Sequence, residues 1–166
     1  MSRLNVEHGS GGPFAAAVFG LSTNSLLSVG VNRVESEHCS AAHAEMMAIM
    51  AAQQLVRHYD LGVGSGEGVE IVSSSEPCAM CQGAIGWAGI SSLVYAARGV
   101  DVCRIGFDEG VKSTDWIRQF RRRHIAVTGG VLRREAVAVL VDYRDRGCLI
   151  YNSVRSSSSA PQESRR

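Results

Sequence analysis

The stretch Val69-Glu-Ile-Val-Ser-Ser-Ser-Glu-Pro-Cys-Ala-Met-Cys81 decides how this chain folds. Its first half, residues 69–74, contains the β-branched residues Val69, Ile71 and Val72 and predicts a strand. Pro77 follows and suits the first position of a helix, because its missing N–H would have no partner there. A helix over residues 78–89 then leads to a second strand at residues 92–97. Strand, helix and strand in this order predict parallel pairing with a right-handed crossover.

Two strands and a helix are predicted upstream of this unit. The apolar run at residues 13–19 is typical of a strand buried on both faces. Residues 26–32 predict the second strand of a hairpin. The sequence from residue 43 to residue 55 is rich in helix formers and free of glycine and proline. We therefore expect a helix over residues 41–58, with Ser40 as its cap.

The remaining segments are assigned from composition and periodicity. The order of strands and helices predicts a three-layer α/β/α domain over residues 1–153. The Ser- and Arg-rich residues 154–166 predict a disordered tail. The other expectations are flexible or irregular chain at residues 1–12, 61–68 and 102–110, a short helix at 116–123, a strand at 125–128 and a long helix at 132–146.

Two short motifs carry residues that bind metals. His43 and Glu45 lie near the start of one predicted helix, and Cys78 and Cys81 lie at the start of the other. Catalytic zinc takes three protein ligands and leaves its fourth position to water. One histidine and two cysteines make three ligands, and Glu45 stands beside them as a carboxylate that need not bind the metal. Cys39 is close enough in sequence to be considered as a fourth ligand, which would instead make a closed structural site.

Composition and charge limit the alternatives. The chain has 166 residues, of which 45% are hydrophobic, and this suits one domain with its own core. A net charge of +1 gives no general attraction to nucleic acid or to an acidic membrane, and no apolar run is as long as a membrane span. The five cysteines show no disulfide pattern, and the N-terminal residues show no signal-peptide region. We expect a cytoplasmic protein without nucleic-acid or membrane partners.

The motif H-x-E…P-C-x-x-C is the signature of zinc deaminases. The chain resembles the cytidine-deaminase-like superfamily, specifically its guanine deaminase branch, and is especially similar to bacterial members that act on guanine and on the triazine ammeline. The resemblance spans about residues 11–153. It rests on Gly11-Gly-Pro-Phe14, Asn32, His43-Ala-Glu45, Glu76-Pro-Cys-Ala-Met-Cys81, Trp87 and Gly106-Phe-Asp-Glu109.

This resemblance implies a central five-stranded mixed sheet, one zinc ion per subunit and a homodimer. In some members the C-terminal segment swaps between subunits and closes the partner's active site. Family members generally have a full helix before Gly-Gly-Pro-Phe, whereas only residues 1–10 precede that motif here.

The resemblance also implies the reaction. The expected activity is hydrolysis of a free amino-purine, above all guanine to xanthine and ammonia, with ammeline as a second substrate. Zinc would generate hydroxide, which attacks the carbon bearing the amine, and Glu45 would move the water proton to the ring nitrogen. Glu109 would carry a second proton to the leaving amine, with Asp108 as its rival for that role.

The same resemblance implies a substrate pocket. Asn32 would hydrogen-bond the purine edge, Phe14 would stack on the ring, Ala44 would take part in binding and Trp87 would form a wall. A nucleoside deaminase acting on guanosine or cytidine is the alternative, and it would need room for ribose. A transfer-RNA deaminase would need a basic surface, which a net charge of +1 argues against. A non-enzymatic alternative is an interaction module stabilised by zinc. The three-ligand count and the free carboxylate of Glu45 argue against it, because such a module would need neither an open zinc position nor this carboxylate.

Overall fold

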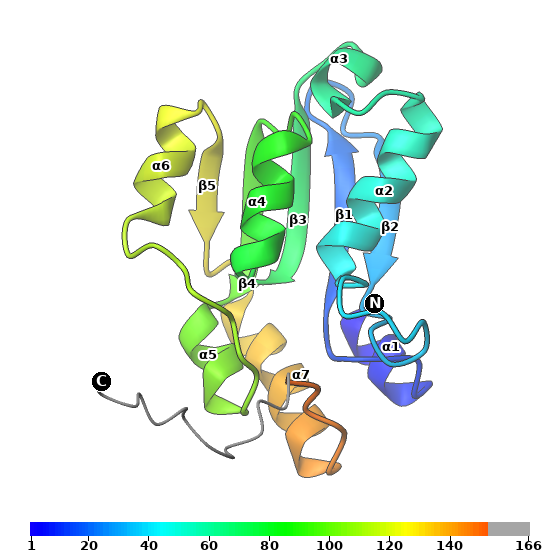
Figure 1. Ribbon diagram of the computed structural model, residues 1–166, viewed down its shortest axis with the longest axis vertical. Coiled ribbons are helices and arrows are strands. Elements are labelled where there is room, and N and C mark those ends of the chain that lie inside the picture. The colour runs from blue at the N-terminus through cyan, green and yellow to red at the C-terminus, as the bar shows by residue number, and fades with distance from the viewer. Residues whose placement is uncertain (153–166) are drawn as a thin grey trace, which may run out of the picture.

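A five-stranded mixed sheet forms the centre of the fold in a computed structural model that describes residues 1–152 (Figure 1). The strand order is β2-β1-β3-β4-β5. β1 pairs antiparallel with β2 and β3, whereas β3 with β4 and β4 with β5 are parallel. The predicted mixed sheet, the hairpin and the parallel strand–helix–strand unit are confirmed. The strands are β1 (Ala15–Gly20), β2 (Leu26–Val31), β3 (Val69–Ser75), β4 (Ser92–Ala97) and β5 (Ala126–Gly129).

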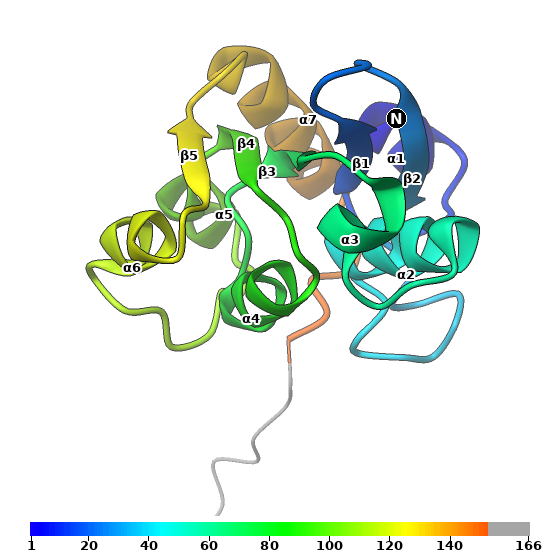
Figure 2. The same cartoon turned by 90° about the horizontal axis from the view of Figure 1, so that it is seen from above.

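Helices cover both faces of this sheet. Seen from above, α2 and α4 lie on one side, and α1 and α7 lie on the other (Figure 2). Each side has its own apolar cluster: Ile71 and Ile85 belong to the first, and Val102 and Leu140 to the second. The three-layer α/β/α prediction is confirmed. The helices are α1 (Ser2–Glu7), α2 (Ala44–Val56), α3 (Leu61–Ser65), α4 (Ala79–Trp87), α5 (Gly99–Arg104), α6 (Trp116–Arg122) and α7 (Arg133–Asp145).

Residues 2–7 form a helix, so the predicted flexible lead-in is wrong there. Val6 is buried in the cluster that includes α7. The Asn5 side chain donates hydrogen bonds to the carbonyl oxygens of Gly12 (2.8 Å) and Asn32 (3.0 Å). These tertiary contacts stabilise a helix of six residues that would not be stable alone.

Two further short helices replace segments that were expected to be irregular. α3 begins where the Asp60 side chain accepts a hydrogen bond from the Val63 N–H. α5 begins where Asp101 accepts a hydrogen bond from the Arg98 N–H and pairs with both Nε and Nη2 of Arg133 (2.8 and 2.7 Å). The Asp101 side chain is 2% exposed and that of Arg133 is 39% exposed, so a partly buried ion pair joins α5 to α7.

Both predicted ligand helices start at a metal-binding residue. His43 is the N-cap of α2 and Cys78 is the N-cap of α4, each with an extended backbone. Ser40 was expected to cap the first helix and does not, because α2 starts at Ala44. Pro77 precedes the cap of α4 instead of occupying its first turn. α2 and α4 lie side by side (Figures 1 and 2), so the two helix starts meet.

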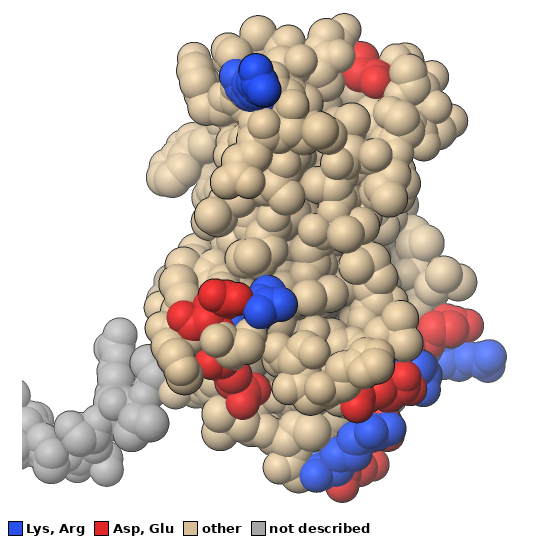
Figure 3. Space-filling model, turned by 90° about the vertical axis from the view of Figure 1, so that its right-hand side faces the viewer, with Lys and Arg blue, Asp and Glu red and all other residues tan. Residues whose placement is uncertain are grey.

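The downstream elements agree closely with the sequence. β4 has the predicted bounds, and α6, β5 and α7 begin and end within one residue of theirs. The predicted disordered tail, residues 154–166, lies outside the described residues. Within residues 1–152, every helix is too short or too polar to cross a lipid bilayer. Figure 3 shows the face over α2 and β2, where charged side chains gather toward the two ends and leave much of the middle uncharged.

The contact between β2 and α2 gives a test of the fold. A Cβ on Gly30 would clash with the Ala44 carbonyl oxygen and lie 2.5 Å from the Ala48 nitrogen. We expect Gly30→Ala to lower the free energy of unfolding by about 1–3 kcal/mol, measured by urea denaturation. Gly83→Ala is the matched control, because its Cβ would meet no atom within 4 Å. That variant should be as stable as the wild type or slightly more stable. Equal stability of all three proteins would contradict the packing described.

Candidate active site

A cavity of about 350 Å³ lies where β3 ends and α2 and α4 begin. Its size is in the usual range for small-molecule sites. The carboxyl ends of strands are also where ligands bind in open α/β sheets. Of the residues predicted from the sequence, the cavity is lined by Phe14, Asn32, His43, Ala44, Glu45, Cys78, Asp108 and Glu109.

Three side chains at one end of the cavity fit a zinc ion. His43 Nδ1 lies 3.4 Å from Cys78 Sγ and 3.7 Å from Cys81 Sγ. Tetrahedral zinc with ordinary bond lengths would separate a nitrogen and a sulfur ligand by about 3.6 Å. Within the described chain no other histidine, cysteine or acidic side chain joins this group, and Cys39 is exposed. The triad therefore matches an open catalytic zinc site and not a closed structural one.

Hydrogen bonding and burial shift the pKa values of the three ligands in different directions. The Cys81 thiol and then the His43 ring lower the pKa of Cys78 to about 4, so Cys78 is a thiolate at neutral pH. The hydrogen bond to Cys78 and burial raise the pKa of Cys81. Burial alone would lower the pKa of His43, but the hydrogen bond and charge of Cys78 outweigh it and raise that pKa. A thiolate and an imidazole in contact form a strong site for zinc.

Glu45 lies next to the triad without being part of it. Its side chain is buried, with Oε1 accepting a hydrogen bond from Ser73 Oγ at 3.1 Å and Oε2 lying 3.5 Å from Cys81 Sγ. Burial raises the pKa of this carboxyl. A carboxylate with a raised pKa takes up a proton more readily, as a general base at neutral pH must do.

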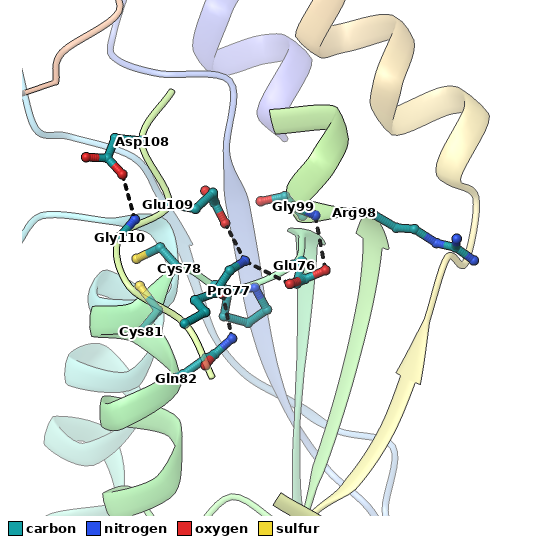
Figure 4. Close-up of polar contacts among 12 residues, drawn as sticks. Glu76, Pro77, Cys78, Cys81, Gln82, Arg98, Gly99, Asp108, Glu109 and Gly110 are labelled. Carbon is teal, nitrogen blue, oxygen red and sulfur yellow. Dashed lines mark hydrogen bonds and ion pairs between the residues drawn. The ribbon is translucent and has the colours of Figure 1, made fainter. Parts of the chain in front are cut away.

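Glu109 and Asp108 differ in their surroundings. The Glu109 side chain is 11% exposed and accepts a hydrogen bond from Lys112 Nζ at 2.9 Å. Burial raises the pKa of Glu109 to about 7, and Lys112 offsets part of that rise. Asp108 is exposed, and its carboxylate accepts a hydrogen bond from the Gly110 N–H at 2.8 Å (Figure 4). The environment of Glu109 is thus the better one for transferring protons.

Asn32 offers a free donor to the cavity. It is fully buried, and its Oδ1 accepts hydrogen bonds from the N–H groups of Gly12 (3.2 Å) and Val34 (3.3 Å). Its Nδ2 has no hydrogen-bond partner within residues 1–152. Buried polar groups are normally paired, so this amide is suited to a ligand that presents an acceptor. Phe14 lies nearby, with its ring edge-on to Phe107 at 5.1 Å between centroids.

The structure does not bring Trp87 into the cavity. Trp87 ends α4 and is 78% exposed. A rise of 1.5 Å per residue carries it about 13 Å along the helix from Cys78, which lies at the end that lines the cavity. The predicted pocket wall is formed by other side chains. Ala44, in contrast, is fully buried in the lining.

Two aromatic residues line the cavity without having been singled out from the sequence. Phe107 and Tyr151 lie 4.9 Å apart, and the Tyr151 ring is 6.5 Å from that of His43. The Asn152 side chain holds this end of the chain against the 106–108 loop through hydrogen bonds to Gly106 O and Asp108 N. Phe107 lies within the Gly-Phe-Asp-Glu motif, but nothing in the local sequence marks Tyr151.

An open zinc triad with an unbound glutamate beside it defines the class of zinc-dependent deaminases. The chain belongs to the cytidine and deoxycytidylate deaminase family, because the model of that family's zinc-binding region matches residues 3–97. The family inferred from the sequence is confirmed, and His43, Cys78 and Cys81 form its zinc-binding triad.

Several relatives are guanine deaminases. The chain is 36% identical to guanine deaminase from Bacillus subtilis (strain 168) over 104 residues, which cover 63% of this chain and 62% of that protein. It therefore spans less than two thirds of that relative. The structure described for guanine deaminase from Nitrosomonas europaea aligns with a TM-score of 0.84 and 45% identity, covering 87% of this chain and 79% of that chain. A crystal structure in complex with 2,6-diaminopurine aligns with a TM-score of 0.86 and 46% identity, covering 91% and 79%.

The triad predicts the effect of removing one ligand. We expect the purified protein to carry one zinc ion per chain and Cys81→Ser to lose it, measured by elemental analysis. Since zinc binds the folded chain, its loss should lower the Tm by about 5 °C or more. Cys103→Ser is the control, because Cys103 is exposed and outside the triad. A Cys81→Ser protein with full zinc content would contradict the assignment.

Proposed function

We propose that this protein is a zinc-dependent aminohydrolase that converts guanine to xanthine and ammonia, with ammeline as a second substrate. One observation carries the proposal. His43 and Cys78 of the zinc triad, the buried Glu45 and Asn32, whose Nδ2 has no hydrogen-bond partner within residues 1–152, all line one cavity of about 350 Å³. The similarity to guanine deaminases, and to a structure that holds a purine, supports a purine base as the substrate.

In the proposed mechanism, two carboxylates move two protons. His43, Cys78 and Cys81 would hold the zinc ion, which would lower the pKa of water toward 7 and so make a nucleophile available for C2 of guanine. Glu45 accepts the water proton and passes it to the adjacent ring nitrogen. Glu109 delivers a proton to the exocyclic amine, which leaves as ammonia. Water supplies the oxygen and both protons, so guanine and water give xanthine and ammonia.

Substrate binding is assigned to Asn32, Phe14 and Ala44 in the lining of the cavity. Asn32 Nδ2 donates a hydrogen bond to an acceptor on the purine edge, while Phe14 stacks on the ring and Ala44 lies under it. The two backbone donors that hold Asn32 Oδ1 keep this amide from turning. A buried amide that requires a partner rejects a base without the matching acceptor more strongly than an apolar wall does.

We also propose a homodimer located in the cytoplasm. The uncharged middle of the face in Figure 3 supports an interface between copies of the chain. Exposed apolar side chains belong to both elements, Leu26 and Val29 to β2 and Met50 and Leu55 to α2. A swapped C-terminal segment stays a prediction, because residues 153–166 lie outside the described part of the chain.

Ammonia release by the zinc-loaded protein tests the proposed function. The panel is guanine, guanosine, ammeline, cytidine and adenine. We expect turnover of guanine well above that of the two nucleosides. Glu45→Gln should keep its zinc and its Tm but lose about 10²–10⁴-fold in kcat, because an amide cannot accept the proton. Preference for guanosine or cytidine would overturn the substrate, and an active Glu45→Gln protein would overturn the mechanism.

The role of Asn32 is tested by Asn32→Asp. This change keeps the oxygen that accepts from Gly12 and Val34 but removes the donor that faces the cavity. A lost hydrogen bond of about 1–3 kcal/mol corresponds to a fall in kcat/KM for guanine of roughly 5- to 150-fold. Zinc content serves as the control for correct folding. Unchanged kcat/KM with full zinc content would exclude Asn32 from binding.

A further inference from the structure

Lys112 is the single lysine of this chain. The sequence contains 17 lysine and arginine residues, and all but this one are arginine. It lies between the 106–110 loop and the sheet, with a side chain only 15% exposed. An ammonium is a compact point charge, whereas a guanidinium is a broad planar group. Position 112 is therefore the one place where this chain has an ammonium instead of a guanidinium.

Two carboxylates bind this ammonium. Lys112 Nζ lies 2.8 Å from Glu76 Oε1 and 2.9 Å from Glu109 Oε2, and the two carboxylate side chains are 14% and 11% exposed. Figure 4 marks these contacts by the dashed lines that reach Glu76 and Glu109. Ion pairs this far from solvent are screened less than surface pairs and hold their partners in defined positions.

The niche for the ammonium is built into the end of the sheet. The second oxygen of Glu76 accepts a hydrogen bond from the Gly99 N–H at 3.1 Å, and the Glu76 N–H donates to Ala97 O at 2.7 Å. A Cβ on Gly99 would lie 2.7 Å from Lys112 Nζ and 3.2 Å from Glu76 Oε1. The space admits an ammonium beside a glycine and leaves little for a larger group.

The contact leaves Glu109 with one oxygen held and one free. Lys112 occupies Oε2, and no donor within residues 1–152 hydrogen-bonds to Oε1. The backbone of Glu109 is fixed as well, because its carbonyl oxygen accepts a hydrogen bond from the Ala79 N–H at 3.0 Å. Since Glu109 lines the cavity, a carboxylate held at one oxygen can turn its other oxygen toward a ligand.

We propose that Lys112, fixed by Glu76 and fitted beside Gly99, is the positioning residue that orients Glu109 for proton transfer to the leaving amine. The proposal rests on the proposed deaminase function. Lys112 itself does not touch the substrate. It acts by holding Glu109 in place, and a small misplacement of a catalytic group is enough to cost about 10²-fold in rate.

Kinetics of Lys112 and Gly99 variants test this role. Lys112→Met keeps the length of the side chain and removes the charge, and we expect kcat to fall by about 10- to 100-fold with KM changed by less than about threefold. Lys112→Arg keeps the charge, but its guanidinium is broader than the space beside Gly99, so we expect kcat to fall in this variant as well. Gly99→Ala keeps every charged group but crowds the ammonium, so it should also lower kcat. Zinc content and Tm identify any variant that fails to fold.

Arg118→Met is the matched control. Arg118 also pairs with a carboxylate three residues away, Asp115, but its side chain is 67% exposed on α6. This variant should keep the wild-type kcat. A Lys112→Met protein with wild-type kcat would overturn the proposal, as would a Gly99→Ala protein whose kcat is unchanged. All rates are measured with the compound of the panel that the wild-type protein deaminates. A wrong choice of substrate therefore appears in the wild-type assay and is distinguished from a wrong role for Lys112, which appears only in the variants.

A single lysine also allows a test without turnover. Protein grown with lysine labelled at Cε with ¹³C gives one side-chain signal in NMR spectra of the zinc-loaded protein. Glu109→Gln should shift this signal, because it removes one of the two carboxylates bound to Nζ. Asp115→Asn should leave it unchanged. A signal that is the same in wild type and Glu109→Gln would show that Lys112 does not hold Glu109, whatever the substrate of the enzyme.

Discussion

The site depends on one geometric constraint, which is that the first residues of α2 and α4 must meet at the end of β3. His43 and Cys78 are the N-caps of these helices, so a small rotation of either helix would move a ligand atom out of zinc range. The glycine at position 30 allows this approach, because any larger residue on β2 would push against the backbone of α2. The metal centre is therefore a consequence of helix–sheet packing as much as of the cysteine and histidine residues.

Two of the carboxyl groups that line the cavity, Glu45 and Glu109, have similar burial but different hydrogen-bond partners. Glu45 and Glu109 are both withdrawn from solvent, which raises the pKa of each. Their partners differ, since Glu45 accepts from the neutral Ser73 hydroxyl and Glu109 from the cationic Lys112. A cation favours the ionised form of its neighbour, whereas a hydroxyl does so only weakly. Two similar groups in one cavity can thus be tuned to different proton-transfer steps by their partners alone.

The sequence predicted what depends on local spacing. Cys78 and Cys81 are three positions apart, which places both thiols on one turn, and the short apolar segment 92–97 has the bounds of β4, so both could be predicted from the sequence. α1 could not, because it is stabilised by Val6 and Asn5 contacts with distant parts of the chain. Tyr151 follows α7 in the chain, and only the tertiary fold brings it to the cavity, so its local sequence gives no sign of this role. Trp87 was expected in the pocket from family resemblance, and the direction of α4 carries it away.

The local charge of the site differs in sign from that of the whole chain. The protein carries a net charge of +1, yet the cavity is lined by the Cys78 thiol and by the acidic residues Glu45, Glu76 and Glu109, of which only Glu76 and Glu109 pair with the Lys112 ammonium. Such an excess of negative groups is costly to bury without a cation, and a divalent metal at the triad reduces that cost. The same excess explains why a positive side chain stands between Glu76 and Glu109: without it, two buried carboxylates would face each other. Zinc held by the triad and Lys112 between Glu76 and Glu109 would each offset part of this negative charge.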